Sequence, residues 1–289
     1  MKRYTFTVPM EILPTRIDAL VRRMLPELPE YVVRDAFEAR DVKMDGVRIP
    51  RSEVAREGAA VQLYTRYVGE SNRLELLYED ENLLVIRKPP GVSCETDAKG
   101  GKTVAQWAGE LLHKANPLAA EPFLCHRLDN QTDGLLLLAK NEKIQNCLSH
   151  AFEKRQIHKA YQCLVRGTPQ KAHRFLKAYL RKDAKQSRVH ILEKPEKGAL
   201  EIITEYEVLQ PGEVCRLRII LHTGRTHQIR AHMAFLGYPL LGDDAYGDRS
   251  FTKGHKAKQL ALCATELWFS LEGELAYLNE KHFQIQPTF

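Results

Sequence analysis

The first 68 residues show a helical apolar pattern twice and then a strand-like alternation. Two apolar sets recur at intervals of three or four residues: Ile17, Leu20, Val21 and Met24, then Val32, Val33, Ala36 and Phe37. Thr15 and Asp18 form a T-x-x-D helix-start signal. Residues 42–49 alternate around Asp45-Gly46, a strong hairpin signal, and residues 61–64 predict a further strand. We therefore predict a small domain over residues 1–68, with two short helices followed by a hairpin, and a polar linker over residues 69–74.

Residues 75–289 combine strand-like runs with fewer helical ones. Residues 83–86 form an apolar run that ends at Lys88-Pro89-Pro90-Gly91, as a strand entering a turn does. Residues 214–221 alternate in part and lead to Thr226, the expected N-cap of a helix whose apolar face carries Ile229, Met233 and Leu236. Strands predominate, so the pattern predicts an α+β domain built on an antiparallel or mixed sheet.

One polar loop stands directly before the most apolar run of the chain. The segment HRLDNQTDGLLLLAKN covers residues 126–141, and the run 135–139 follows an Asp-Gly turn, as a buried strand would. Asp129 should therefore lie at the mouth of a core, where loops carry catalytic side chains on rigid elements. The alternative is that Asp129 only hydrogen-bonds its own loop, as in an Asx turn.

Length and composition indicate a globular protein of about two domains. The chain has 289 residues, 44% of them hydrophobic and 28% charged, and no apolar stretch approaches the ~20 residues of a membrane helix. Its first residues have no apolar signal-peptide core, so we expect a cytoplasmic protein. The six cysteines are widely spaced, which favours neither a zinc site nor a disulfide framework.

Positive charge is concentrated in one segment. The net charge is only +6, but residues 151–190 contain eleven Lys and Arg against two Asp and Glu. A segment of this kind is suited to a polyphosphate such as RNA, because neutralising phosphates releases counterions. The alternative is a solvated face whose charge is balanced in space by acidic segments such as residues 201–207.

Four motifs, in one order, carry a resemblance to a known family. They are LLYEDENLLVIRKPPGVSCETD (76–97), HRLD with its T, G and apolar run (126–141), HKAYQCLVRG (158–167) and LHTGRTHQIRAHMAFLGYPLLGD (221–243). From Leu76 to the C terminus the chain resembles the RluA-type pseudouridine synthase family. Asp133 departs from the family pattern, which usually has serine or threonine there. Residues 1–68 resemble the alpha-L type RNA-binding domain found in a ribosomal protein.

The resemblance implies an RNA pseudouridine synthase with a central curved sheet flanked by helices and no cofactor. It assigns catalysis to Asp129, the pairing cation to Arg230 and the active-site tyrosine to Tyr161. A cation is needed because a buried carboxylate otherwise takes up a proton. Whether Asp129 attacks as a nucleophile or removes a proton stays open at this stage.

A second set of residues is expected to bind RNA. Arg127 is expected to brace the gap left by the extruded nucleotide, since a base must leave its stack before it can react. His126 is expected to fix this loop, and Arg225 and His227 are expected at a helix entrance, where they contact either substrate phosphate or the loop. The full set is His126, Arg127, Lys177, Arg181, Lys182, Lys185, Arg225 and His227.

Several alternatives accompany this prediction. Ribosomal RNA is the favoured substrate and transfer RNA is the alternative. The competing hypothesis is a protein that is not an enzyme but an RNA-binding or ribosome-assembly factor. The histidines at 222, 227 and 232 do not share a helix face, so we predict no metal site. We expect a monomer without membrane contact.

Overall fold

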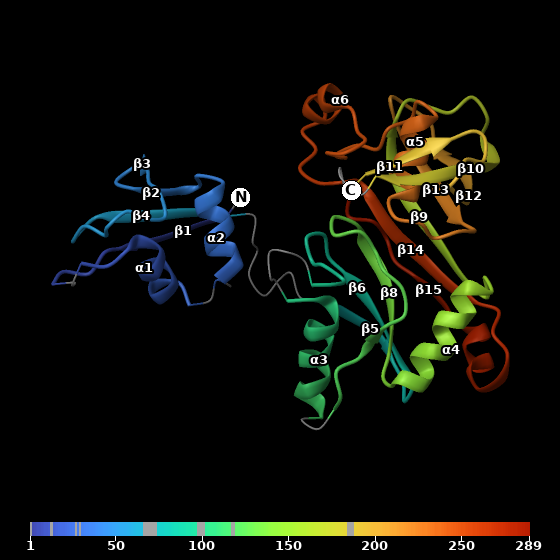
Figure 1. Ribbon diagram of the computed structural model, residues 1–289, viewed down its shortest axis with the longest axis horizontal. Helices are drawn as coiled ribbons and strands as arrows, with labels where there is room; N and C mark the ends of the chain where they lie inside the picture. Colours follow the sequence, from blue (N-terminus) through green and yellow to red (C-terminus); the bar gives the residue numbers. More distant parts are fainter. Residues whose placement is uncertain are drawn as a thin grey trace. The chain divides into compact units, whose positions relative to one another are not determined.

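The computed structural model describes residues 2–11, 14–26, 28, 30–65, 74–96, 102–116, 119–183 and 188–289. The chain divides into two compact units, Met1–Arg73 with Glu95–Lys102, and Leu74–Cys94 with Thr103–Phe289. Each unit has its own sheet (Figure 1). Each also has its own apolar core. The expected linker lies outside the described residues except for Leu74, which is buried.

The N-terminal unit contains a four-stranded antiparallel sheet in the order β1-β4-β2-β3. Its elements are β1 (Lys2–Thr7), α1 (Ile17–Met24), α2 (Glu30–Glu38), β2 (Val42–Met44), β3 (Val47–Arg48) and β4 (Ala60–Thr65). The expected order of two helices and a hairpin is present. Strand β1, which pairs with β4, was not predicted because its partner is distant in sequence.

Local chemistry explains the hairpin but not the start of α1. Asp45 and Gly46 both have positive φ, 51° and 81°, the conformation that the two-residue turn requires. Helix α1 has Arg16 rather than Thr15 at its N-cap. The Asp18 carboxylate accepts hydrogen bonds from Arg16 and Arg51, so the T-x-x-D interpretation of this helix start is wrong. Residues of α1, α2, β2 and β4 form the core of the unit.

The larger unit is built on one mixed sheet in the order β11-β10-β12-β13-β9-β14-β8-β6-β5, with β15 on β14 and β7 on β8. The β8–β14 pair is parallel and the other described pairs are antiparallel, in agreement with the predicted α+β class. Its strands are β5 (Glu75–Glu79), β6 (Leu83–Lys88), β7 (Phe123–Leu124), β8 (Asp133–Ala139), β9 (Ile157–Arg166), β10 (His173–Asp183), β11 (Arg188–Leu192), β12 (Leu200–Gln210), β13 (Val214–Leu221), β14 (Leu262–Phe269) and β15 (His282–Gln284).

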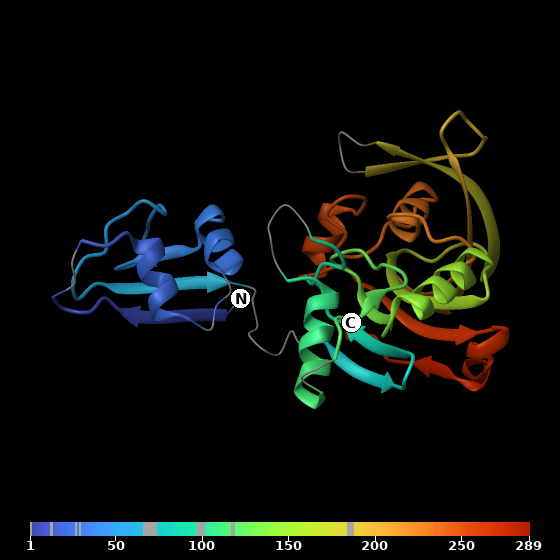
Figure 2. The same cartoon turned by 60° about the horizontal axis from the view of Figure 1, so that its bottom comes forward.

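Helices cover both faces of the sheet near β8. The described helices of this unit are α3 (Val104–Ala115), α4 (Glu142–Glu153), α5 (Gln228–Phe235), α6 (Arg249–Gly254) and the 3₁₀ helix η2 (Gly273–Glu280). Leu136 and Leu138 of β8 belong to the core with α3 and α5, while Leu135 and Leu137 belong to the core with α4 and η2. All seven residues of β8 are buried, which confirms the predicted strand. Figure 2 shows the hairpin of β10 and β11, which packs against α5.

The start of α5 differs from the expectation. The helix begins at Gln228, and its N-cap is His227, which has left-handed backbone angles (φ 53°, ψ 18°). The side chain of Gln228 turns back and accepts a hydrogen bond from the Arg225 amide at 3.0 Å. Thr226 is therefore not the cap, and the left-handed turn directs the His227 ring differently from a helical residue.

Candidate active site

Asp129 lies in the loop that connects β7 to β8. The Thr132 amide donates to the Asp129 carbonyl at 3.0 Å, so the loop closes on itself as a turn. The Gly91 amide donates to the carbonyl of Asn130 at 2.8 Å, which ties the loop to the Pro-Pro-Gly turn after β6. The Asp129 side chain is 25% exposed. The backbone is thus held while the carboxylate keeps access to solvent.

The buried side chain of Lys88 also holds this loop in place. Its side chain is fully buried, and its Nζ donates to the carbonyls of Pro89, Val92 and Asn130 at 2.9–3.0 Å. These three bonds use all the donors of an ammonium group. Burial lowers the pKa of Lys88 to about 8. The sequence gives no sign of this role, because the acceptors are backbone groups that no side-chain pattern identifies.

Asp133, the residue that departs from the family pattern, forms an ion pair with Arg87. Its two carboxylate oxygens accept from Nε and Nη2 of Arg87 at 3.0 and 2.6 Å. The next residue, Gly134, has φ +126° and lies so close to Ala264 of β14 that a Cβ would clash with its backbone. Arg87 therefore neutralises the carboxylate that replaces the usual hydroxyl at this position.

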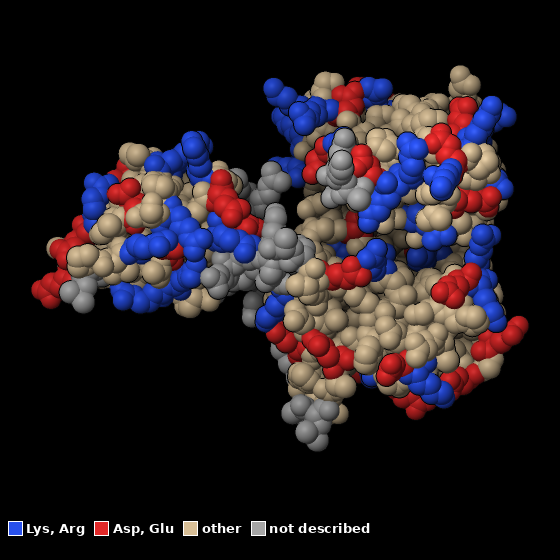
Figure 3. All heavy atoms as spheres, in the orientation of Figure 1, with Lys and Arg blue, Asp and Glu red and all other residues tan. Residues whose placement is uncertain are grey.

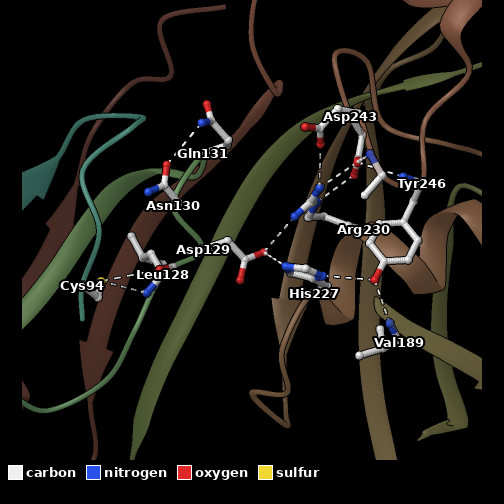
Figure 4. A network of polar contacts seen from close by, with 12 residues as sticks. Cys94, Leu128, Asp129, Asn130, Gln131, Val189, His227, Arg230, Asp243 and Tyr246 are labelled. Carbon is white, nitrogen blue, oxygen red and sulfur yellow. Dashed lines mark hydrogen bonds and ion pairs between the residues drawn. The ribbon is translucent and has the colours of Figure 1, made fainter. Parts of the chain in front are cut away.

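Arg230 contacts Asp129, but its principal partner is a residue that the sequence analysis did not single out. Nη1 of Arg230 lies 3.6 Å from Oδ2 of Asp129 (Figure 4). Nε and Nη2 of the same side chain bind the carboxylate of Asp243 at 2.8 and 2.7 Å. Burial works against the charge of Arg230, but the pair with Asp243 raises its pKa. Asp243 thereby fixes the guanidinium of Arg230 in an orientation in which Nη1 faces Asp129.

His227 is the second residue that lies beside the carboxylate of Asp129. Its Nε2 is 4.0 Å from Oδ2 of Asp129, and its Nδ1 is 3.0 Å from the hydroxyl of Tyr246. Burial lowers the pKa of His227, and Arg230 acts in the same direction. A contact with substrate phosphate or with the loop was expected of this residue, and in the structure its ring is directed to the carboxylate of Asp129.

Tyr161 is a buried residue of β9, opposite Ile219 of β13 and Ala264 of β14. Burial raises the pKa of its hydroxyl, and the Asp129 carboxylate raises it further. The phenol therefore stays protonated. The structure brings Asp129, His227 and Arg230 together, three residues that were predicted from the sequence.

His126 is part of the scaffold. Its Nε2 accepts a hydrogen bond from the Leu137 amide at 3.1 Å, and its ring packs on Phe152 with centroids 4.7 Å apart. Its Nδ1 is buried without a hydrogen-bond partner among the described residues. Burial keeps the pKa of His126 well below its usual value, and Lys159 acts in the same direction. This ring fixes the loop to β8.

The remaining predicted RNA-binding residues differ in their surroundings. Arg127, Lys182 and Arg225 have exposed side chains. Lys177 and Arg181 of β10 instead form surface ion pairs with Glu201 and Glu196, at 2.5 and 2.7 Å. Part of the charge of the basic segment is therefore balanced within the protein, which is the alternative that the sequence left open. Lys185 lies outside the described residues.

The three histidines considered for a metal site contact different partners. His222 binds Glu205, His227 binds Tyr246 and His232 binds Thr204. Among the described residues, no group of three or more His, Cys, Asp or Glu side chains could hold a metal ion. In the same part of the chain, no helix is both long and apolar enough to cross a membrane.

Comparison with known proteins identifies the family. The family described as RNA pseudouridylate synthase matches residues 82–235, which contain Asp129, Tyr161 and Arg230. The ribosomal large subunit pseudouridine synthase D of Haemophilus ducreyi is 30% identical over 257 residues, 85% of this chain and 77% of the relative. The synthase C of Salmonella typhimurium is 33% identical over 279 residues, 89% and 86% of the two chains.

The chain belongs to the RNA pseudouridylate synthase family. It is therefore an isomerase that forms pseudouridine in RNA, as the four motifs predicted. The structure of human RNA pseudouridylate synthase domain containing 4 shares the fold, with a TM-score of 0.61 and 22% identity over 74% of this enzyme and 88% of that chain.

Three residues of the site were missed: Lys88, Asp243 and Tyr246. All lie in or next to the quoted motifs, in KPPG and in GDDAYG. Lys88 binds backbone carbonyls, Asp243 binds Arg230 and Tyr246 binds His227, and the sequence pattern identifies none of these pairings. The one sequence signal for Asp243 was its position in the same motif as Arg230.

Proposed function

We propose that this enzyme isomerises uridines of large-subunit ribosomal RNA, with Asp129 as the catalytic carboxylate. The observation that carries the assignment is that Oδ2 of Asp129 faces Arg230 and His227, while the side chain keeps a quarter of its surface exposed. A neighbouring cation favours the ionised carboxylate, the form needed either to attack the sugar carbon or to remove a ribose proton. The relatives with ribosomal large subunit in their names support the choice of RNA.

Tyr161 and Arg127 act on the target nucleotide in this proposal. The ring of Tyr161 packs against the uracil, and its hydroxyl acts as a hydrogen-bond donor because burial keeps it protonated. Arg127 is exposed two residues before Asp129 and braces the gap left in the RNA when the uridine is extruded. Aromatic packing and a bracing cation together hold the base beside the carboxylate.

The RNA backbone is held by basic surface in both units. Figure 3 shows Lys and Arg side chains bordering a hollow on the visible face of the larger unit. Arg225 and Lys182 contribute exposed charge from the α5 entrance and from β10. The N-terminal unit, with its alpha-L type order of elements, is proposed to add affinity for long RNA. Neutralised phosphates release counterions, so this binding weakens with salt.

The deciding experiment is pseudouridine mapping of ribosomal and transfer RNA from cells with and without the protein. Sites in large-subunit RNA that vanish, and that return with the wild type but not with Asp129→Asn, support the proposal. If the only pseudouridines that vanish are in transfer RNA, the substrate is transfer RNA and not ribosomal RNA. Sites restored by Asp129→Asn would remove Asp129 from the chemistry, and an unchanged map would favour a binding or assembly factor.

A separate assay tests the N-terminal unit. Deleting residues 1–68 should weaken binding to long ribosomal RNA more than it lowers turnover on a short substrate. Equal loss of both would indicate that the unit serves the stability of the enzyme instead.

A further inference from the structure

The hydroxyl of Tyr246 connects the β10–β11 hairpin to the ring that faces Asp129. The Val189 amide, at the start of β11, donates to this hydroxyl at 2.9 Å, and Nδ1 of His227 lies 3.0 Å from it (Figure 4). The opposite nitrogen of the ring, Nε2, is 4.0 Å from Oδ2 of Asp129. One continuous line of polar atoms therefore runs from a strand backbone to the catalytic carboxylate.

The hydrogen positions along this line start from one fixed donor, the Val189 amide. A tyrosine hydroxyl has one proton and two acceptor lone pairs. Since the Val189 amide donates to it, the hydroxyl can give its own proton to Nδ1 of His227. A neutral ring that accepts at Nδ1 has its proton on Nε2. Burial lowers the pKa of His227, in keeping with the neutral form.

We propose that Tyr246 is a positioning residue, which fixes His227 in the tautomer whose Nε2–H points at Oδ2 of Asp129. Oδ2 then faces both His227 and Arg230, and Oδ1 is left for the uridine. This inference rests on the proposed role of Asp129 and adds Tyr246 to it. It also reassigns His227 from phosphate binding to orientation of the carboxylate.

Packing around Tyr246 leaves its ring little freedom. The guanidinium of Arg230 lies 5.4 Å from the ring centroid, and that of Arg188 lies 6.0 Å from it. The edge of the His227 ring meets the phenol at 75°, with centroids 5.6 Å apart. Tyr246 also packs on the apolar cluster that joins the hairpin to α5. A ring held on these sides presents its hydroxyl in one direction.

The backbone of His227 gives an independent sign that the ring direction matters. Its φ of 53° is uncommon for a residue with a side chain, although histidine tolerates it better than most. Such conformations persist where the surroundings impose them, and they occur often at functional sites. Here the left-handed turn places the ring between Tyr246 and Asp129 instead of along α5.

Nitrogen-15 NMR of the protein labelled in histidine tests the tautomer without RNA. The signals of His227 are assigned by their loss in His227→Gln. The Nε2–H tautomer is expected in the wild type and a mixture of tautomers in Tyr246→Phe, which loses only the hydroxyl. A Nδ1–H tautomer in the wild type, or no change in Tyr246→Phe, would overturn the proposal.

Kinetics test whether Tyr246 acts through His227. Tyr246→Phe should lower kcat about tenfold with KM unchanged, as expected for one hydrogen bond. His227→Ala should lower kcat further, and His227→Gln should recover part of the loss because its amide can donate to Asp129. The double variant His227→Ala/Tyr246→Phe should match His227→Ala alone. Losses that multiply in the double variant would show that Tyr246 acts independently.

A matched control separates this effect from the general loss of a bonded hydroxyl. Tyr277 lies on η2. Its hydroxyl donates a hydrogen bond to the Asp80 carboxylate at 2.7 Å and accepts one from the Asn82 side-chain amide at 3.1 Å. Tyr277→Phe should leave kcat and the His227 tautomer unchanged, and a kcat loss equal to that of Tyr246→Phe would refute the positioning role. If the wild type forms no pseudouridine, the proposed function fails, while the tautomer measurement still decides the inference.

Discussion

Two aspartates at the ends of one short loop have opposite environments. Asp133 is buried, and both of its oxygens are used by Arg87 at 3.0 and 2.6 Å. Asp129 is 25% exposed, and its Oδ2 lies 3.6 and 4.0 Å from Arg230 and His227, at distances that leave hydrogen-bonding capacity unused. A carboxylate with all its partners within the protein stabilises the fold. A carboxylate held by its surroundings but not saturated by them is suited to chemistry.

The largest expected effect tests Asp129. Asp129→Asn removes the charge and keeps the shape, so we expect turnover to fall by at least about a thousandfold. The free energy of unfolding should change by less than about 1 kcal/mol, because the side chain is partly exposed and has no short ion pair. Pseudouridine formation in single-turnover assays and urea unfolding measure the two quantities. Retained turnover would contradict the contrast between the aspartates.

Asp133 should show the reverse behaviour. Asp133→Ala leaves the Arg87 guanidinium without its partner and should lower the free energy of unfolding by about 3 kcal/mol. Turnover of the folded fraction should change little. The double variant Arg87→Leu/Asp133→Ala should recover most of the stability, because no unpaired charge is left. A loss of turnover at unchanged stability would instead assign Asp133 to substrate contact.

The same contrast applies to two histidines five residues apart: the ring of His227 faces Asp129, whereas His232 is part of the core. His232 is buried against Thr204, and burial lowers its pKa to about 4. The unfolded chain therefore binds a proton first as the pH falls below about 6.5, and stability is lost from there down to pH 4. His232 alone should cost about 2 kcal/mol between pH 7 and pH 5. Urea unfolding of the wild type and His232→Gln measures this cost, and identical pH dependence of both would disprove it.

The smallest expected effect compares two neighbouring cations of β10. Arg181 is paired with Glu196 at 2.7 Å, whereas Lys182 has no ion pair within the described part of the chain. Lys182→Gln should reduce the slope of log affinity against log salt by about 1, as for one lost phosphate contact. Arg181→Gln should change it less, because its charge is already partly balanced. Equal changes would mean that RNA displaces Glu196.

Several parts of the molecule could be predicted because their causes are local. The Asp45-Gly46 turn, the apolar faces of α1 and α2 and the buried run of β8 depend on neighbours a few residues away. The motifs also led to Asp129 and Arg230, which the fold brings within 3.6 Å of each other. Family and activity followed from the order of these motifs along the chain.

Other features were decided only by the tertiary structure. The anchor of Arg230 on Asp243, the buried pair of Asp133 with Arg87 and the ion pairs of Lys177 and Arg181 join strands and loops that the sequence does not place together. The direction of the His227 ring depends on a left-handed residue and on a hydroxyl from another loop. The sequence by itself determined which side chains and local elements are present, because propensity and periodicity act over a few residues. The fold alone decided which polar groups are saturated and which are left for substrate, because burial and charge pairing act through space.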